Sequence, residues 1–150
     1  LRLAAQGRDG LGALNFWRSV EHKRSHWNTA DQVLERLKLS ARAETLAGEL
    51  SHGQQRVLEV GMSICAKPTL LMLDEPTSGM GIDDIPVMTD LISDLGRDHT
   101  VLLIEHNMSI VMSISQRITV MCHGQILVEG TPEQVRNDER VRTAYLGEAA

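Results

Sequence analysis

The stretch that decides the fold class is "LLMLDEP", Leu70 to Pro76. Its first four residues form a short apolar run, which is typical of a strand buried on both faces of a parallel sheet. A helix is predicted from residue 83 or 84 to residue 95, with Pro86 in its first turn and Gly96 as its stop. A second apolar run, "TVLLI" at 100–104, predicts another buried strand. This alternation of strand, helix and strand predicts an α/β layer fold.

Further elements are predicted on both sides of this unit. Residues 29–39, "TADQVLERLKL", predict a helix that starts with a capping box of Thr29 and Gln32, and a second helix begins near Ser51 and ends before Pro68. Downstream, we expect a helix at 107–115, a hairpin of 117–122 and 125–130 around a His123-Gly124 turn, and a helix opened by Thr131, Pro132 and Gln134. Residues 1–27 show only a glycine-rich loop at Gly7–Gly12.

Composition excludes several classes of protein. Apolar residues make up 42% of the 150 residues and charged residues 23%, as in ordinary globular domains. The formal net charge of -5 argues against a nucleic-acid partner. The two cysteines form no metal or disulfide pattern, and no apolar run is long enough for a transmembrane helix.

His22 and His26 are one helical turn apart, but no third metal ligand stands out. The methionines 88, 108, 112 and 121 are interpreted as core residues.

Titratable residues follow both predicted strands. Asp74 and Glu75 leave the first strand, and Glu105 and His106 leave the second. Ligands of open α/β sheets bind at the carboxyl ends of the parallel strands. The two acids are either a solvated loop start or a functional pair in which Asp74 holds a hard cation such as Mg²⁺ and Glu75 is a base. Pro76 is expected to hold Glu75 in an extended conformation.

The helix that begins near Ser51 raises a separate question. Ser51 and Gln54 fit a capping box, which would explain both residues without a ligand. The capping box does not explain Gly53, because glycine is a poor residue in a helical turn. Glycine allows close approach to the backbone, and the N–H groups of a helix start attract anions, above all phosphate.

Three motifs together resemble one family. "LSHGQQR" (50–56), "LLMLDEP" (70–76) and "LLIEH" (102–106) resemble, in order and spacing, the signature, Walker B and switch-histidine motifs of ATP-binding cassette ATPases. "SGMG" after the Walker B motif and the tail "EGTPEQVRNDERVRTAYLGE" are similar to the importer ATPases for branched-chain amino acids and their urea and amide relatives. The resemblance implies the C-terminal part of a P-loop NTPase domain, with a helical subdomain at 1–66, a parallel-strand core at 67–130 and a helical tail at 131–150.

The resemblance also implies roles for individual residues. Asp74 would hold Mg²⁺ through water, Glu75 would polarise the attacking water as a general base, and His106 would contact the γ-phosphate of ATP. The turn of Ser51, His52, Gly53 and Gln54 would bind the nucleotide of a second ATPase subunit. Further implied partners are integral-membrane permease subunits at the cytoplasmic face of the membrane and, indirectly, a solute-binding protein.

The sequence departs from the family pattern in three places. The P-loop, G-x-x-x-x-G-K-[ST], is missing, because no glycine in this chain is followed by lysine. We therefore expect a C-terminal portion of the ATPase, inactive by itself. The family's aspartate is missing near Gly81, where Asp83 or Asp84 could substitute. His52 stands where the family has a glycine, either as an exposed spacer or as a nucleotide contact. Two alternatives remain: a non-transport ATPase of DNA repair or of the ribosome, and a non-catalytic dimer module.

Overall fold

The computed structural model describes Leu1 and residues 20–146, with side chains from residue 27 to residue 144. The chain divides into two compact units, Leu1–Ile104 and Glu105–Ala150, and each is described by itself. The glycine-rich segment Gly7–Gly12 and the side chains of His22 and His26 lie outside the described residues. The boundaries expected at residues 66 and 130 remain a prediction.

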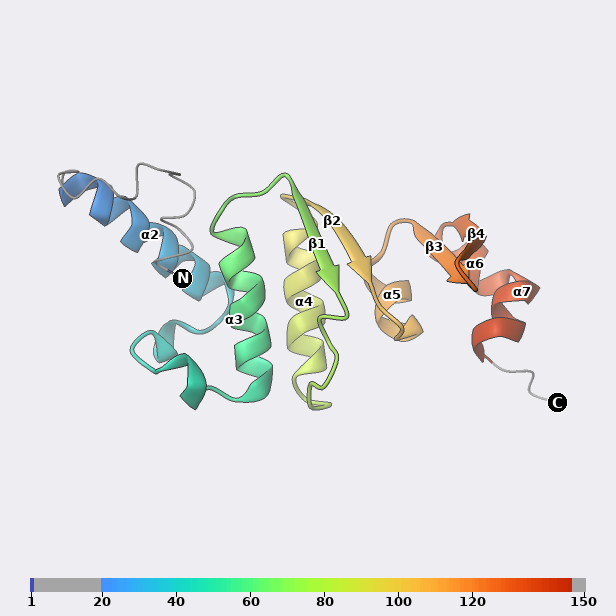
Figure 1. Cartoon of the computed structure of the whole chain (residues 1–150), viewed down its shortest axis with the longest axis horizontal. Coiled ribbons are helices and arrows are strands. Elements are labelled where there is room, and N and C mark those ends of the chain that lie inside the picture. Colours follow the sequence, from blue (N-terminus) through green and yellow to red (C-terminus); the bar gives the residue numbers. More distant parts are fainter. Residues whose placement is uncertain (2–19, 147–150) are drawn as a thin grey trace. The chain divides into compact units, whose positions relative to one another are not determined.

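The first unit contains three long helices and a two-stranded sheet (Figure 1). Helix α2 spans Val20–Arg36, the short 3-10 turns η2 and η3 span Ser40–Arg42 and Ala47–Glu49, and α3 spans His52–Ile64. Strand β1 (Leu70–Asp74), helix α4 (Ile85–Leu95) and strand β2 (Thr100–Ile104) complete it. The strands pair in parallel, with Leu71 opposite Val101 and Asp74 opposite Ile104. The predicted strand–helix–strand unit and its α/β class are confirmed.

Burial on both faces of the strands was a wrong expectation. In β1, Leu71 and Leu73 are buried, whereas Leu70 and Met72 are 49% and 65% exposed. On β2, Leu102 opposite Met72 and Ile104 opposite Asp74 are exposed as well. Within the described part of the first unit, helices pack on one face of this two-stranded sheet, so alternate residues of each strand face outward.

The expected start of a helix at Thr29 was also wrong. Helix α2 begins at Val20, so Thr29 lies inside it and cannot act as its N-cap. The end of α2 follows a Schellman pattern, because the Lys38 N–H donates to the Glu35 carbonyl at 3.0 Å and the Leu39 N–H to the Leu34 carbonyl at 2.9 Å. Lys38 takes the left-handed conformation that this stop requires, with φ of 58°. Leu39, just beyond the stop, is buried.

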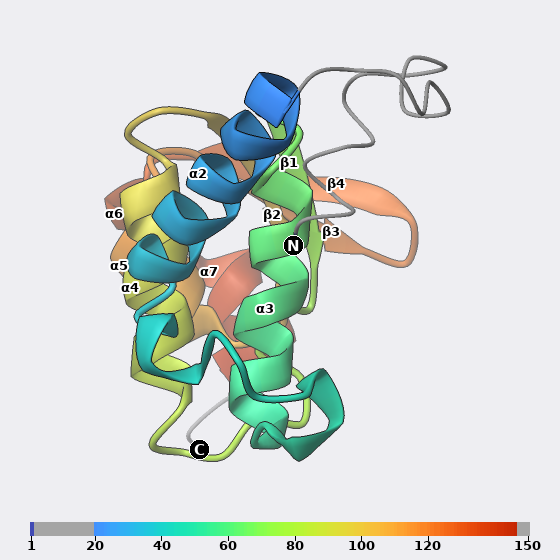
Figure 2. The same ribbon diagram turned by 90° about the vertical axis from the view of Figure 1, so that its left-hand side faces the viewer.

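Helices α3 and α4 carry the core of the first unit. Both run in the direction opposite to the strands and lie side by side, and α2 packs across them (Figure 2). The buried face of α3 is the predicted one: Val57, Val60, Gly61, Ile64 and, at its C-cap, Cys65. Helix α4 has Asp84 at its N-cap, Pro86 in its first turn and Gly96 at its C-cap, as predicted. Arg36 of α2 ties the helices together, because its Nε donates to Asp94 Oδ2 at 2.8 Å.

The second unit is a helix-flanked hairpin. Helix α5 (Met108–Ile114) is followed by antiparallel strands β3 (Ile118–Cys122) and β4 (Gln125–Gly130), then by α6 (Pro132–Asn137), α7 (Glu139–Val141) and a π-helical turn η4 (Arg142–Leu146). His123 and Gly124, with φ of 49° and 76°, form the predicted two-residue turn. Thr131 and Gln134 form the predicted capping box. The core of this unit consists of Ile118, Val120, Val135 and Val141.

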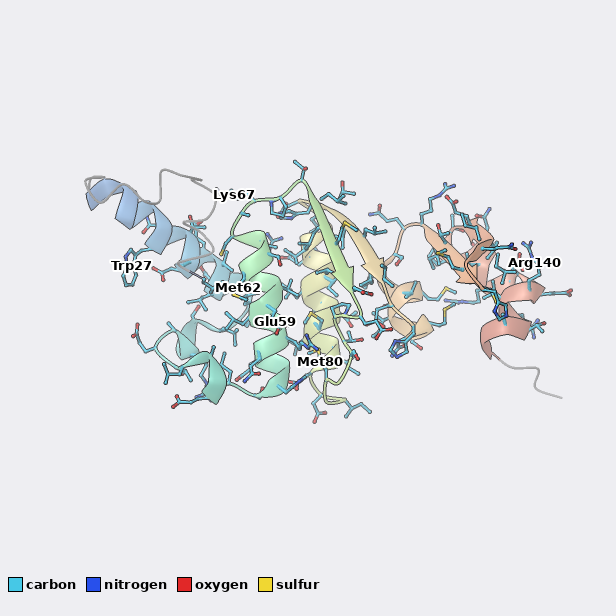
Figure 3. The ribbon with its side chains drawn as sticks, in the orientation of Figure 1. Trp27, Glu59, Met62, Lys67, Met80 and Arg140 are labelled. Atoms are coloured by element: carbon cyan, nitrogen blue, oxygen red, sulfur yellow. The ribbon has the colours of Figure 1, made fainter. Side chains whose placement is uncertain are left out.

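Several smaller expectations have mixed outcomes. Met88 is fully buried, and Met108 and Met112 pack against the core of the second unit, but Met121 is 54% exposed and was wrongly interpreted as a core residue. Cys65 and Cys122 are free thiols. Asp138 caps α7 and pairs with the exposed Arg140, which Figure 3 labels. Within residues 20–146, no helix combines the length and apolar character needed to cross a membrane.

Candidate functional site

The start of α3 is a hydrogen-bonded turn built by its own residues. The Gln54 N–H donates to Ser51 Oγ at 3.2 Å, and the Ser51 N–H donates to Gln54 Oε1 at 3.2 Å, so the predicted capping box is confirmed. Gln55 adds a feature that the sequence did not reveal. Its side-chain amide donates to the carbonyls of Ala47 and Leu50, both at 3.1 Å, and thereby fixes the approach to α3.

Gly53 is buried in the first turn of α3 because another side chain occupies its empty side. A Cβ added to Gly53 would overlap the carboxylate of Asp84, the N-cap residue of α4. The same added atom would lie 2.8 Å from Asp84 Cβ, so more than the mobile end of the side chain is involved. The close approach expected at Gly53 is therefore made within this chain, by an acidic side chain.

His52 lies beside the loop that follows β1. His52 is exposed, and its Cε1 atom lies 3.6 Å from the position that a Cβ on Gly79 would take. Gly79 has φ of 72°, a left-handed conformation that glycine adopts without strain. His52 is thus an exposed residue whose ring approaches this loop near Gly79, which the sequence could not show.

Asp74 and Glu75 end β1 at the carboxyl edge of the sheet, as predicted. Asp74 is exposed, and the Glu75 N–H donates to the Ile104 carbonyl of β2 at 2.8 Å. The expected extended conformation of Glu75 was wrong, because its φ is 44°. The ladder bond to Ile104 and a turn closed by the Ser78 N–H on the Glu75 carbonyl, at 3.0 Å, hold this conformation against the preference that Pro76 imposes.

Glu105 and His106 open the second unit. The Glu105 side chain has no exposed surface, and its Oε2 accepts from the backbone N–H groups of His106 at 3.1 Å and Asn107 at 3.3 Å. The His106 imidazole is 68% exposed, with Nδ1 at 3.8 Å from the same oxygen. Asn107 then caps α5 through the Ser109 N–H. A buried carboxylate therefore shapes the turn that presents His106.

The structure groups the predicted residues into three places. Ser51, His52, Gly53 and Gln54 share the first turn of α3, with Asp84 against it. Asp74 and Glu75 lie at the other end of the loop that leads to Asp84, and Met80 marks the middle of that loop in Figure 3. His106 belongs to the second unit. Within the described residues, no three His, Cys, Asp or Glu side chains cluster as a metal cage.

Two known families match this chain. The family described as "ABC transporter" matches residues 6–78, which contain the α3 start and the Asp74-Glu75 pair, and the family described as "Branched-chain amino acid ATP-binding cassette transporter" matches residues 125–150. This chain belongs to the ATP-binding cassette transporter family. Within that family, it groups with the ATP-binding subunits of branched-chain amino acid transporters.

Individual relatives of this cassette chain agree. The high-affinity branched-chain amino acid transport ATP-binding protein BraF of Pseudomonas aeruginosa is 45% identical over 127 residues, which are 83% of this chain and 48% of BraF. The corresponding LivG protein of Escherichia coli K12 is 46% identical over 118 residues, which are 77% of this chain and 46% of LivG. The cassette chain thus spans about half the length of the curated relatives it matches.

A solved structure supports the fold. MJ1267, an ATP-binding cassette of an ABC transporter, superposes with a TM-score of 0.76 at 28% identity, covering 96% of this chain and 60% of MJ1267. The predicted class, an α/β part of a cassette ATPase domain with a helical region and parallel strands, is therefore confirmed.

Proposed function

We propose that this chain is the C-terminal portion of the ATP-hydrolysing subunit of a membrane importer for branched-chain amino acids or similar small solutes. The observation that carries the proposal is the pair Asp74 and Glu75, intact at the carboxyl end of a parallel strand, in a chain whose α3 starts with the cassette signature turn. Family membership and the names of the relatives support the transported class.

The residues present fit Mg²⁺ and the terminal phosphates of ATP. Asp74 offers one exposed carboxylate, and Mg²⁺ is commonly bound by one or two carboxylates together with water and substrate phosphates. The α3 start offers backbone N–H groups at the positive end of a 13-residue helix. When bound, Mg²⁺ would neutralise charge on the phosphates, and phosphoryl transfer depends mostly on positioning and charge stabilisation.

Each chain residue then has a proposed role. Glu75 accepts a proton from the attacking water. The hydrogen bonds at its backbone N–H and carbonyl fix the position of the backbone from which its side chain extends. His106 donates a hydrogen bond to the γ-phosphate from the turn that Glu105 shapes. Ser51, His52, Gly53 and Gln54 face the nucleotide held by a second ATPase subunit. Permease subunits at the cytoplasmic face of the membrane and a solute-binding protein complete the proposed assembly.

The exposed face of the sheet supports the proposal that a longer protein contains this chain. Leu70, Met72, Leu102 and Ile104 form one apolar surface on the paired strands, and each is about half exposed or more. Sheets of two strands are marginal without a covering layer. Because the relatives are about twice as long, a further segment of the same polypeptide is proposed to cover this face and to carry the P-loop.

Calorimetric titration with Mg-ATP tests whether nucleotide binding requires the part of the longer protein that carries the P-loop. The 150-residue chain should show no binding in the micromolar range, because the phosphate cradle of the P-loop is absent from its sequence. The longer protein should bind ATP in that range. Micromolar binding by the 150-residue chain alone would contradict the proposed assignment of nucleotide binding to the missing half.

A further inference from the structure

One close contact connects the start of α3 to the loop between β1 and α4. We name residues 75–84 the Glu75–Asp84 loop. At its far end the Asp84 side chain lies on Gly53, and near its middle His52 Cε1 lies 3.6 Å from the position that a Cβ on Gly79 would take. The Gly53–Asp84 contact joins residues 31 positions apart in the sequence, so it is a tertiary contact between the signature helix and the loop that begins at Glu75.

Asp84 is held in place against Gly53 by its backbone. The Asp84 N–H donates to the Gly81 carbonyl at 2.9 Å, and the Asp84 carbonyl accepts from the Met88 N–H at 3.2 Å as α4 begins. A side-chain rotation could move the carboxylate away from an added Cβ on Gly53, but it could not move Asp84 Cβ, which lies within 2.8 Å of that position. Any larger residue at position 53 would therefore displace the backbone of the loop.

The side chain of Asp84 contacts α3 rather than capping its own helix, α4. Asp84 is the N-cap residue of α4, yet its carboxylate makes no cap hydrogen bond there. It lies instead against Gly53 in the first turn of α3. Glycine is less favourable than alanine inside a helical turn, so the contact with Asp84 gives a structural reason for glycine at position 53.

We propose that Asp84 is a positioning residue that docks the Glu75–Asp84 loop onto Gly53. The loop is then fixed at both ends: at Glu75 by its hydrogen bonds to Ile104 and Ser78, and at Asp84 by the shape of the α3 start. The docking sets the orientation of the loop that carries Glu75. The catalytic consequence rests on the proposed function, whereas the docking itself does not.

A double-mutant cycle in thermal unfolding of the 150-residue chain tests the docking. Gly53→Ala should lower Tm by several degrees, although glycine-to-alanine changes in helices ordinarily raise it. Asp84→Gly keeps an acceptable N-cap and should change Tm little, and the double variant should recover the wild-type Tm or exceed it. Gly48→Ala is the matched control, because an added Cβ there meets no atom within 4 Å. A higher Tm for Gly53→Ala, or an equal loss of Tm in the Asp84→Gly background, would overturn the docking.

Turnover in the longer protein tests the positioning role. Asp84→Gly should lower kcat for ATP about tenfold with KM changed less than twofold, and Asp84→Asn, which keeps the shape of the side chain, should retain kcat within about twofold. Unchanged kcat in Asp84→Gly, or equal loss in both variants, would overturn the role. If the wild-type protein hydrolyses no ATP, the proposed function fails, while the unfolding cycle still decides the docking.

Discussion

Arg36 gives the sharpest stability prediction, because one side chain joins α2 to the end of α4. Its Nε donates to Asp94 Oδ2 at 2.8 Å, and its Nη2 donates to the Asp94 carbonyl at 3.1 Å and to Asp98 Oδ2 at 2.9 Å. Arg36→Met keeps much of the aliphatic stem and removes all three bonds. We expect this variant to loosen α2 from α4.

The magnitude follows from exposure. Hydrogen bonds to charged groups contribute roughly 1.5–3 kcal/mol when protected, and exposed ion pairs roughly 0.2–1 kcal/mol. The Arg36 side chain is 27% exposed, Asp94 is 44% exposed and Asp98 is 62% exposed, so the Asp98 pair belongs to the weaker class. The loss on Arg36→Met is therefore about 1.5 kcal/mol, which corresponds to a fall in Tm of roughly 6–10 °C for a unit of this size.

The assay is thermal unfolding followed by circular dichroism, with Arg97→Met as the control. Arg97 approaches the same aspartate, but at 3.9 Å and with a side chain that is 79% exposed. Its removal should lower Tm by about 2 °C or less. Equal shifts in Arg36→Met and Arg97→Met would refute the reasoning that burial and geometry, rather than the number of ion pairs, give Arg36 its effect.

Three further predictions concern other parts of the chain. Lys38→Gly should raise stability by about 1 kcal/mol in chemical denaturation, because Lys38 has φ of 58° at the end of α2; an unchanged midpoint would contradict this. Burial raises the pKa of the Cys65 thiol, so the folded state loses stability as pH rises through the range in which thiols ionise. In alkylation at about pH 8 followed by mass spectrometry, Cys122 should be modified first and Cys65 only on unfolding. The hydrogen bond from Arg140 lowers the pKa of Asp138. The ionised Asp138 therefore contributes to the stability of the fold above the ordinary carboxyl range, and this contribution is lost as pH falls through the lowered pKa. Asp138→Asn should flatten the acid side of a Tm-against-pH curve, and an unaltered curve would argue against the pair.

Local rules predicted part of the fold from the sequence. Ser51 with Gln54 and Thr131 with Gln134 form real capping boxes, because the residue before each N-cap is extended: Leu50 before Ser51, and Gly130 at the end of β4 before Thr131. The same pattern at Thr29 and Gln32 failed, because α2 already runs through it from Val20. A capping pattern therefore identifies a helix start only where the residues before it leave the helix.

The candidate site shows where local rules end. The sequence predicted that Asp74 and Glu75 follow an apolar strand. It also predicted a candidate site there, because ligands bind at the carboxyl ends of parallel strands. The left-handed conformation of Glu75 was not, because it depends on a hydrogen bond to Ile104, about 30 residues away. The contact of Asp84 with Gly53 was signalled only by a glycine that the capping box could not explain.

The most direct measurement is steady-state ATP turnover by the longer protein, compared between the wild type and the Glu75→Gln variant. The variant keeps the size of the side chain and loses its capacity to accept a proton, so turnover should fall at least about a hundredfold while ATP binding is retained and a closed dimer accumulates. Turnover in the Glu75→Gln variant within a few-fold of wild type would contradict the role of this carboxylate as the base.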